Sequence, residues 1–127
     1  NFDQDSNFRK ITKSIEIVYG LRNFIGNANK FSRETVYINL KSDSEITEII
    51  IEDDGNGYPR DVLSKIGEPY LRSSNSLETS NMGLGLGLFI GKTLLEKNFA
   101  SINCRNSKTR SGAEVIVRWK NRDLFNI

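Results

Sequence analysis

The segment from Ile15 to Phe31 has the hydrophobic period of an amphipathic α-helix. Its apolar side chains recur at spacings of one, three and four residues, which places them on one face of a helix. Ser14 precedes the segment and is a residue type preferred at a helix N-cap. We therefore predict a helix that begins after Ser14, with an apolar face made of Ile17, Val18, Leu21, Phe24, Ile25 and Ala28.

Two pairs of segments alternate between apolar and polar residues, as β-strands with one buried face do. "TVYINLKSD" and "EITEIIIED" (residues 35–43 and 45–53) flank a polar turn at Asp43 and Ser44. "ASINCRN" and "AEVIVRW" (residues 100–106 and 113–119) flank a second turn, from Lys108 to Gly112. The pattern predicts two β-hairpins.

Three more elements are predicted between the hairpins. The loop "DDGNGYP" leads into a short helix over residues 60–66, which begins after Pro59. A mobile loop rich in serine and asparagine is expected over residues 68–81, and a second long helix over residues 84–98. This order of elements predicts a two-layer α/β sandwich with the helices on one face of the sheet.

Composition excludes several classes of function. The 127 residues form one domain, and a net charge of +2 is too small to indicate nucleic acid as the main partner. The single cysteine, Cys104, excludes an internal disulfide, fits a reducing compartment and is expected to be a packing residue. No apolar run approaches the ~20 residues that span a bilayer. Histidine is absent, which excludes any mechanism that uses an imidazole of this chain.

The segment "MGLGLGLFIGKT" (residues 82–93) concentrates glycine and contains a Gly-Lys-Thr triplet. A Walker phosphate loop needs a glycine five residues before Gly91, where the chain has Leu86. A dinucleotide fingerprint needs a glycine where the chain has Leu88. Both motifs are therefore absent, and the lysine and threonine of the triplet are expected on the exposed face of a helix.

Strictly alternating glycines remain just before the second long helix, at Gly83, Gly85 and Gly87. Without side chains the backbone can approach phosphates closely, and a helix N-terminus offers free N–H groups. A flexible hinge or a tightly packed helix start would use the same residues. This segment by itself therefore leaves phosphate binding open.

Two polar clusters bear on that question. Asn23, Asn27 and Lys30 are spaced by four and three residues, so they share one stripe of the first helix. Amide oxygens and an ammonium group on one line suit Mg²⁺ and the phosphates it bridges, and a solvated helix face is the alternative. The loop "IEDDGNGYP" (residues 51–59) places carboxylates at a strand end, where one could accept a hydrogen bond from an exocyclic amine. A plain acidic turn is the alternative there.

Taken together and in this order, these segments resemble the N, G1 and G2 boxes of the GHKL ATP-binding superfamily. More narrowly, they resemble the catalytic ATP-binding domain of bacterial sensor histidine kinases. Within that group, their residues are most similar to those of redox-responsive kinases of the RegB/PrrB type. The resemblance covers about residues 14–118: "GLRNFIGNANKFS" is similar to the N box, "DDGNG" to the G1 box, "EPYLRS" to the F box and "GLGLGLFIGKTLLE" to the G2 box. It implies the Bergerat fold, with a mixed, mostly antiparallel sheet, about three helices on one face, and a mobile ATP lid over about residues 68–83.

The resemblance also implies roles for individual residues. In such kinases the second asparagine of the N box binds Mg²⁺, which is Asn27 here, while Asn23 lines the same site and Lys30 contacts phosphate. These three are the implied catalytic residues, and Asp53 is implied to accept the adenine amino group. The remaining positions implied to bind ATP are Phe31 beside the adenine, Gly55 and Gly57 shaping its pocket, Arg72 in the lid, and Gly83, Leu84, Gly85, Leu86 and Gly87 around the triphosphate.

One position separates kinases from hydrolases in this superfamily. Members that hydrolyse ATP carry a glutamate four residues before the metal-binding asparagine, where this chain has Asn23, an amide that cannot take a proton. The resemblance therefore implies transfer of the γ-phosphoryl group to a histidine on a separate dimerisation domain, with a response regulator as an indirect partner. The chain itself is expected to be monomeric, cytoplasmic and not inserted in a membrane, which is compatible with an inner-membrane sensor as the parent.

Two other functions stay open on the sequence. An ATP-gated interaction module would bind nucleotide without transferring phosphate, and a serine kinase of the anti-sigma-factor kind shares the fold and the boxes.

Two departures from the kinase pattern also stand out. "KNFAS" replaces a glycine pair after the second long helix, which predicts an altered helix exit, and Asn81-Met82 replaces the double glycine that usually opens the G2 box.

Overall fold

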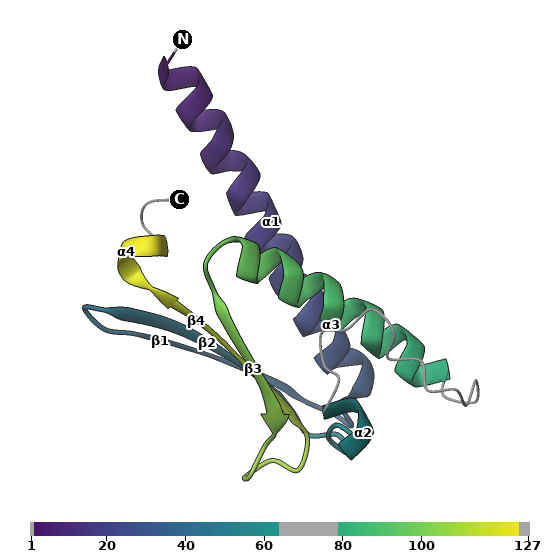
Figure 1. Ribbon diagram of the computed structural model, residues 1–127. Helices are drawn as coiled ribbons and strands as arrows, with labels where there is room; N and C mark the ends of the chain where they lie inside the picture. Colours follow the sequence, from purple (N-terminus) through teal and green to yellow (C-terminus); the bar gives the residue numbers. More distant parts are fainter. Residues whose placement is uncertain (1, 64–78, 125–127) are drawn as a thin grey trace.

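The computed structural model describes the backbone of residues 2–63 and 79–124, and the side chains of residues 13–63 and 87–124. Along the chain, a helix is followed by two strands, two helices, two strands and a last short helix (Figure 1). None of the helices in these ranges combines the length and the apolar character needed to cross a membrane. The elements in chain order are α1 (Phe2–Phe31), β1 (Val36–Ser42), β2 (Ile46–Asp53), α2 (Arg60–Leu63), α3 (Thr79–Lys97), β3 (Ser101–Asn106), β4 (Ala113–Lys120) and α4 (Asn121–Leu124).

The four strands form one sheet in the order β1-β2-β4-β3, and all three pairings are antiparallel. Both predicted hairpins are confirmed, as β1–β2 and β3–β4. The central pair β2–β4 joins them, with Ile51 opposite Val115. This pairing places the end of β2 beside the β3–β4 turn, although 60 residues separate Asp53 from Ala113. The predicted two-layer α/β sandwich is confirmed.

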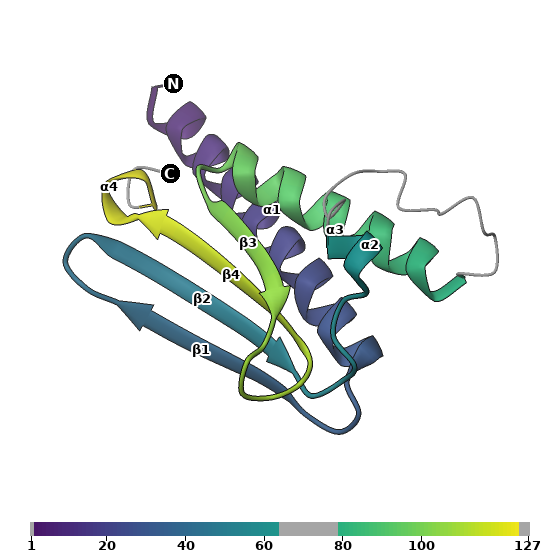
Figure 2. The ribbon, with the colours of Figure 1, turned by 60° about the horizontal axis from the view of Figure 1, so that its bottom comes forward.

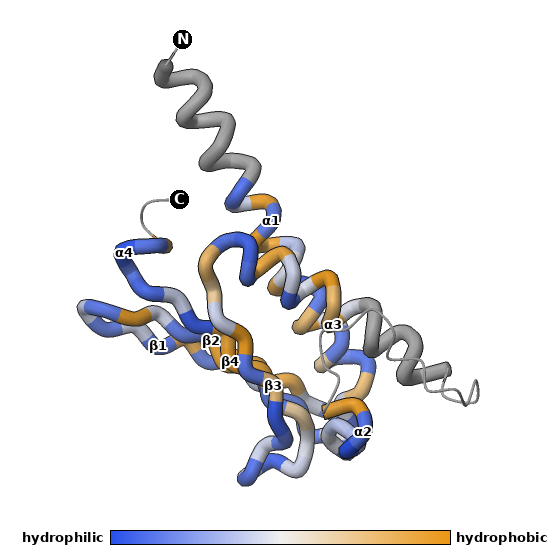
Figure 3. Tube along the Cα trace, in the orientation of Figure 1, coloured by the Kyte–Doolittle hydropathy of each residue, from blue (hydrophilic) through white to orange (hydrophobic). Residues whose placement is uncertain are grey.

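Helices α1 and α3 lie side by side on one face of the sheet and run in opposite directions (Figures 1 and 2). Apolar residues gather where these helices face the middle of the sheet (Figure 3). Each fully buried leucine or phenylalanine contributes about 1.5–3 kcal/mol relative to an exposed one. The buried core consists of Phe24, Ala28, Ile51, Tyr58, Val62, Leu88, Leu95, Ala100, Val115, Val117 and Trp119.

The helical layer does not extend over β1, which forms one edge of the sheet (Figure 2). Ile38 and Leu40 share the face of Ile51 and Ile49, their partners on β2. They nevertheless remain 52% and 69% exposed. The covered part of the sheet is therefore β2, β4 and β3.

Cys104 packs on the helical side of β3 against the core, as the sequence predicted. Burial raises the pKa of its thiol to about 12. Reactivity of a cysteine depends on its thiolate form, which this environment disfavours at neutral pH. The position therefore supports packing rather than redox chemistry.

Glycines allow the close approach of α1 and α3. A Cβ at Gly91 would come within 2.9 Å of the Phe24 ring and 3.1 Å of the Gly20 carbonyl oxygen, and a Cβ at Gly20 would meet Leu95 at 2.8 Å. Gly91 of the Gly-Lys-Thr triplet is therefore a helix-packing residue. Its neighbour Lys92 pairs with Glu96 one turn later, at 3.1 Å. The prediction that this triplet is not a phosphate loop agrees with both contacts.

The predicted start of α1 is wrong. The helix begins at Phe2 rather than after Ser14, so Ser14 is an interior residue and not the N-cap. Residues 2–13 contain no glycine or proline to stop the helix. Once a helix is nucleated, each further residue adds a hydrogen bond, so it propagates through such a segment. Periodicity located the packed part of the helix and missed its extension.

The predicted start of α3 is also wrong. The helix begins at Thr79 rather than Leu84, so Gly83, Gly85 and Gly87 lie inside it. A glycine inside a helix costs about 1 kcal/mol relative to alanine, and the leucines between these glycines are good helix formers. Helix propagation therefore outweighs the local preference. Residues 79–83, which were expected in the lid, therefore belong to the helix.

The short helix after Pro59 is confirmed as α2, which covers residues 60–63. Its predicted continuation to residue 66 and the predicted loop over residues 68–78 lie outside the described residues. The end of α3 agrees with the prediction to within one residue.

The exit of α3 forms a Schellman motif. The N–H of Ala100 donates to the Leu95 carbonyl and the N–H of Phe99 to the Glu96 carbonyl, at 3.0 and 3.1 Å. The motif requires a left-handed residue, usually glycine, and here Phe99 adopts it with φ of 72°. The altered exit expected from "KNFAS" is therefore a change of residue within an ordinary helix cap. Phe99 is 58% exposed, so burial of its ring does not compensate for the strain.

We expect Phe99→Gly to raise the free energy of unfolding by about 1 kcal/mol, because glycine adopts positive φ without steric strain. The measurement is urea denaturation followed by the fluorescence of Trp119, the single and buried tryptophan. Phe99→Ala is the matched control, since it removes the ring and keeps the Cβ. An equal gain in both variants would contradict the backbone explanation.

Candidate functional site

The contact between the C-terminal part of α1 and the first half of α3 contains an unsatisfied polar group. A Cβ at Gly87 would come within 2.9 Å of Nδ2 and 3.0 Å of Oδ1 of Asn27. Nδ2 is buried, and no described residue accepts a hydrogen bond from it. Leaving such a group unpaired costs about 1–3 kcal/mol. A bare glycine facing an unsatisfied amide marks this contact as a candidate ligand site.

Asn23 lies one helical turn before Asn27 on α1. Its Nδ2 donates to the carbonyl of Tyr19 at 2.8 Å, so its amide is oriented by its own helix. Lys30 lies one turn after Asn27 and is exposed, with its ammonium 5.4 Å from the centre of the Phe31 ring. The structure thus arranges the three implied catalytic residues along one side of the end of α1.

Asp53 ends β2 and its carboxylate is almost fully buried. Oδ1 accepts hydrogen bonds from the N–H groups of Gly55 and Ala113, at 2.8 and 3.3 Å. None of the described residues donates to the other oxygen, Oδ2. One oxygen therefore fixes the carboxylate, and the other is a candidate acceptor for a hydrogen bond from a ligand.

The neighbouring carboxylate, Asp54, has a structural role. It accepts hydrogen bonds from the N–H groups of Arg33, Glu34 and Thr35, at 2.8, 3.1 and 3.2 Å. These bonds, led by the one from Glu34, hold the pKa of Asp54 below its usual value. Asp54 therefore ties the end of α1 to the start of β1, and Asp53 is the candidate ligand-binding member of the pair.

Gly55 and Phe31 meet where the loop after β2 crosses the end of α1. A Cβ at Gly55 would lie 2.1 Å from the Phe31 carbonyl oxygen, so only glycine fits there. Asn27 and Phe31 are four residues apart on α1, a rise of about 6 Å. The Asn27–Gly87 contact and the Asp53 loop are therefore adjacent along one helix.

Tyr58 lies at the end of the loop that begins at Asp53. Its side chain is buried, and its pKa is raised well above the usual value by burial first and then by the nearby Cys104 and Asp53. The phenol consequently stays neutral. Gly57 precedes it with φ of 79°, a conformation that glycine adopts without strain.

The β3–β4 turn also contacts this loop, which the sequence did not predict. A Cβ at Gly112 would lie 2.0 Å from the Asp53 carbonyl oxygen, and the hydroxyl of Ser111 donates to the Gly55 carbonyl at 3.3 Å. In the sequence, the one signal for this contact was the glycine at the end of the hairpin turn. A glycine at such a position is too common to predict a contact. The order β2-β4-β3 is what brings this turn to the loop.

The structure describes the other predicted site residues to different extents. Gly83 and Gly87 lie four residues apart on α3 and share one side of it, whereas Gly85 lies on the opposite side. Leu84 and Leu86 belong to the same part of the helix, where the backbone alone is described. Arg72 lies outside the described residues. The nucleotide contacts predicted for these positions stay predictions.

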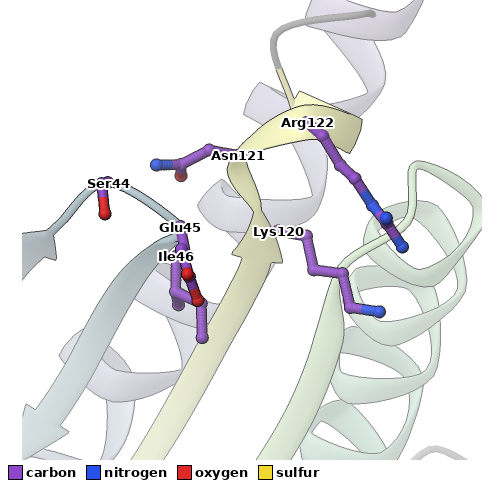
Figure 4. A pocket seen from close by; sticks show the side chains of 6 residues that line it. All are labelled: Ser44, Glu45, Ile46, Lys120, Asn121 and Arg122. Atoms are coloured by element: carbon purple, nitrogen blue, oxygen red, sulfur yellow. The ribbon is translucent and has the colours of Figure 1, made fainter.

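A hollow of about 400 Å³ lies at the opposite end of the sheet and has a structural explanation. Asn121 donates to the Asp43 carbonyl and accepts from the hydroxyl of Thr47, at 2.8 and 2.7 Å, which joins α4 to the β1–β2 turn. Figure 4 shows the side chains of Lys120 and Arg122 extending away from that turn. The lining residues are Ser44, Glu45, Ile46, Lys120, Asn121 and Arg122.

Comparison with known proteins identifies relatives of the chain. The model of the family described as histidine kinase-, DNA gyrase B- and HSP90-like ATPase matches residues 12–123. Sensor histidine kinase RegB of Cereibacter sphaeroides is 38% identical over 124 residues, which cover 86% of this chain and 27% of RegB. Sensor protein RstB of Escherichia coli is 31% identical over 99 residues, which cover 78% of this chain and 23% of RstB. The chain thus spans about a quarter of each relative.

Two solved structures share the fold. The mycobacterial sensor histidine kinase MprB superposes with a TM-score of 0.64 at 24% identity, over 80% of this chain and 70% of that one. Full-length ShkA in complex with AMPPNP superposes with a TM-score of 0.62 at 24% identity, over 82% of this chain and 21% of that one. At this identity the superpositions establish the architecture.

Proposed function

Because the chain belongs to the family of histidine kinase-, DNA gyrase B- and HSP90-like ATPases, we propose that it is the Mg·ATP-binding catalytic domain of a two-component sensor histidine kinase. The observation that carries the proposal is the Asn27 amide opposite Gly87, whose buried Nδ2 has no partner among the described residues. The ligand-facing oxygen of Asp53 adds a second recognition point beside it. Homology to RegB and RstB supports the kinase class.

The residues present fit Mg·ATP. Asn27 offers an amide oxygen, a ligand type that Mg²⁺ accepts, next to a backbone that bears no side chain at Gly87. When bound, Mg²⁺ neutralises charge on the β- and γ-phosphates. Asp53 Oδ2 accepts the adenine amino group, Phe31 packs beside the ring, and Lys30 contacts phosphate. These residues bind and orient the nucleotide for an acceptor.

Asn23 favours phosphotransfer over hydrolysis. A hydrolase of this family needs a base to take a proton from water, and an amide cannot do so. The Asn23 amide is moreover held to the Tyr19 carbonyl. In the transfer, an imidazole nitrogen of the acceptor forms a bond to the γ-phosphorus while the bond to the β,γ-bridging oxygen breaks, which leaves ADP. The imidazole N–H proton is released to solvent.

The partners follow from this reaction. The chain contains no histidine, so the acceptor belongs to a dimerisation domain of the parent kinase, and a response regulator then receives the phosphoryl group. We place the chain in the cytoplasm as one part of a longer sensor, in line with the relatives' names as sensor proteins. Cys104 has no role in the transfer.

The test mixes the chain with a dimeric helical hairpin that bears the acceptor histidine, in γ-labelled ATP and Mg²⁺. We expect label on the hairpin that is lost in acid and retained in base, which identifies phosphohistidine. The chain alone is the internal control and should stay unlabelled, because it contains no histidine.

Each other outcome favours a different function. ATP binding without labelling of the hairpin would indicate the ATP-gated interaction module. An acid-stable product on a protein substrate would indicate a serine kinase. Absence of ATP binding with Mg²⁺ present would overturn the assignment altogether.

A further inference from the structure

The loop from Asp53 to Tyr58 forms the adenine side of the proposed nucleotide site, and its shape is set by residues outside it. A side chain from the end of β3 makes the most direct contact. Oδ1 of Asn106 accepts the N–H of Tyr58 at 2.6 Å, and Nδ2 of Asn106 donates to the Tyr58 carbonyl at 3.1 Å. One amide therefore satisfies both backbone polar groups of Tyr58, as a neighbouring strand would.

The same amide occupies the space next to Gly57. A Cβ at Gly57 would lie 2.7 Å from Oδ1 of Asn106. Gly57 is therefore required twice, by its positive φ and by the closeness of Asn106. The glycine and the asparagine form one contact, contributed by segments that are 48 residues apart at their hydrogen bond.

Asn106 faces Ala113 across the β3–β4 ladder. The N–H of Ala113 donates to Oδ1 of Asp53, at the start of the loop, while Asn106 holds Tyr58 at its end. This single cross-strand pair consequently sets the separation between the two ends of the loop. Ser107 anchors the pair, because its hydroxyl donates to Glu52 on β2 at 2.8 Å.

We propose that Asn106 is a positioning residue of the adenine subsite. It acts by holding the backbone of Gly57 and Tyr58 in the conformation that shapes the base pocket opposite Asp53. It touches Tyr58 and Gly57 and has no role at the Asn27–Gly87 contact. Loss of Asn106 consequently weakens recognition of the base and leaves recognition of the phosphates intact. This inference rests on the proposed function.

The test compares two ligands on the intact chain, Mg·ATP and Mg·tripolyphosphate, by isothermal titration. In Asn106→Ala we expect the Kd for ATP to rise about tenfold, equivalent to about 1.4 kcal/mol. The Kd for tripolyphosphate, which has no base, should stay within about twofold, since no phosphate contact is altered. Asn103→Ala is the matched control, because Asn103 is exposed on the same strand. It should change neither constant.

The outcomes separate this inference from the proposed function. An unchanged Kd for ATP in Asn106→Ala, or an equal loss for both ligands, would overturn the positioning role while wild type still binds ATP. A wild-type chain that does not bind ATP would overturn the proposed function. Trp119 fluorescence checks that each variant is folded. Should Asn106→Ala not fold, Asn106→Asp keeps the acceptor for the Tyr58 N–H, removes the donor to its carbonyl, and is measured in the same way.

Discussion

Replacement of Asn27 by alanine is expected to remove the dependence of ATP binding on Mg²⁺. The wild-type chain should bind ATP more tightly with Mg²⁺ than with a chelator, and in Asn27→Ala the two dissociation constants should converge. The amide provides the oxygen ligand, and the three atoms nearest to a Cβ at Gly87 all belong to Asn27. Phosphotransfer to the acceptor histidine should fall by about 10²–10³-fold, the usual loss when a preorganised charge-stabilising group is removed.

Stability provides an independent check on the same variant. Nδ2 of Asn27 is buried without a partner among the described residues, so its removal breaks no hydrogen bond there. The free energy of unfolding should therefore change by about 1 kcal/mol or less. Asn29→Ala is the matched control, since Asn29 is exposed on the same helix two residues later. An undiminished Mg²⁺ effect in Asn27→Ala, or an equal loss in Asn29→Ala, would contradict the assignment.

Asp53→Asn is expected to weaken ATP binding by about 10- to 100-fold, because a charge-assisted hydrogen bond contributes about 1.5–3 kcal/mol. The asparagine oxygen can still accept the N–H groups of Gly55 and Ala113, so the loop keeps its anchor. Its NH₂ then replaces Oδ2 and faces the adenine amino group, donor against donor. The chain should therefore lose affinity for ATP without losing its fold.

Inosine triphosphate tests the recognition of the amino group directly, because it carries an oxygen where ATP carries that group. Wild type should prefer ATP, and Asp53→Asn should narrow or reverse that preference, since the new NH₂ can donate to the oxygen. Both constants are measured by titration in Mg²⁺. Asp123→Asn, in α4 at the opposite end of the sheet, is the control and should retain the wild-type preference. An unchanged preference in Asp53→Asn would show that this carboxylate does not recognise the base.

The placement of many candidate site residues could be predicted from the sequence because these residues follow local rules. The spacing of Asn23, Asn27 and Lys30 placed them on one stripe of a helix, and the structure has them there. The alternation in residues 46–53 placed Asp53 at a strand end. Spacing also excluded the Walker loop, in agreement with the packing of Gly91 against Phe24.

The helix boundaries could not be predicted because propagation competes with local preference. Ser14 is a good N-cap residue by type, and the alternating glycines are poor helix formers. Both lie inside helices, since the helical hydrogen bonds continue through them. Residue type describes the preference of one position, whereas a helix end depends on the whole run of neighbours.

By itself the sequence determined the order of seven of the eight described elements, the two hairpins and the motifs that carry the chemistry, and it missed the short helix α4. All of these depend on periodicity and spacing within about twenty residues, the reach of helix, strand and turn patterns. The tertiary structure alone decided which aspartate keeps a carboxylate oxygen without a donor among the described residues, which glycine meets Asn27, and that Asn106 holds the loop. Those contacts join positions 48 to 60 residues apart. The strand order β1-β2-β4-β3 brings β3 and β4 to the loop after β2, and the packing of α3 against α1 brings Gly87 to Asn27. No local pattern encodes either arrangement.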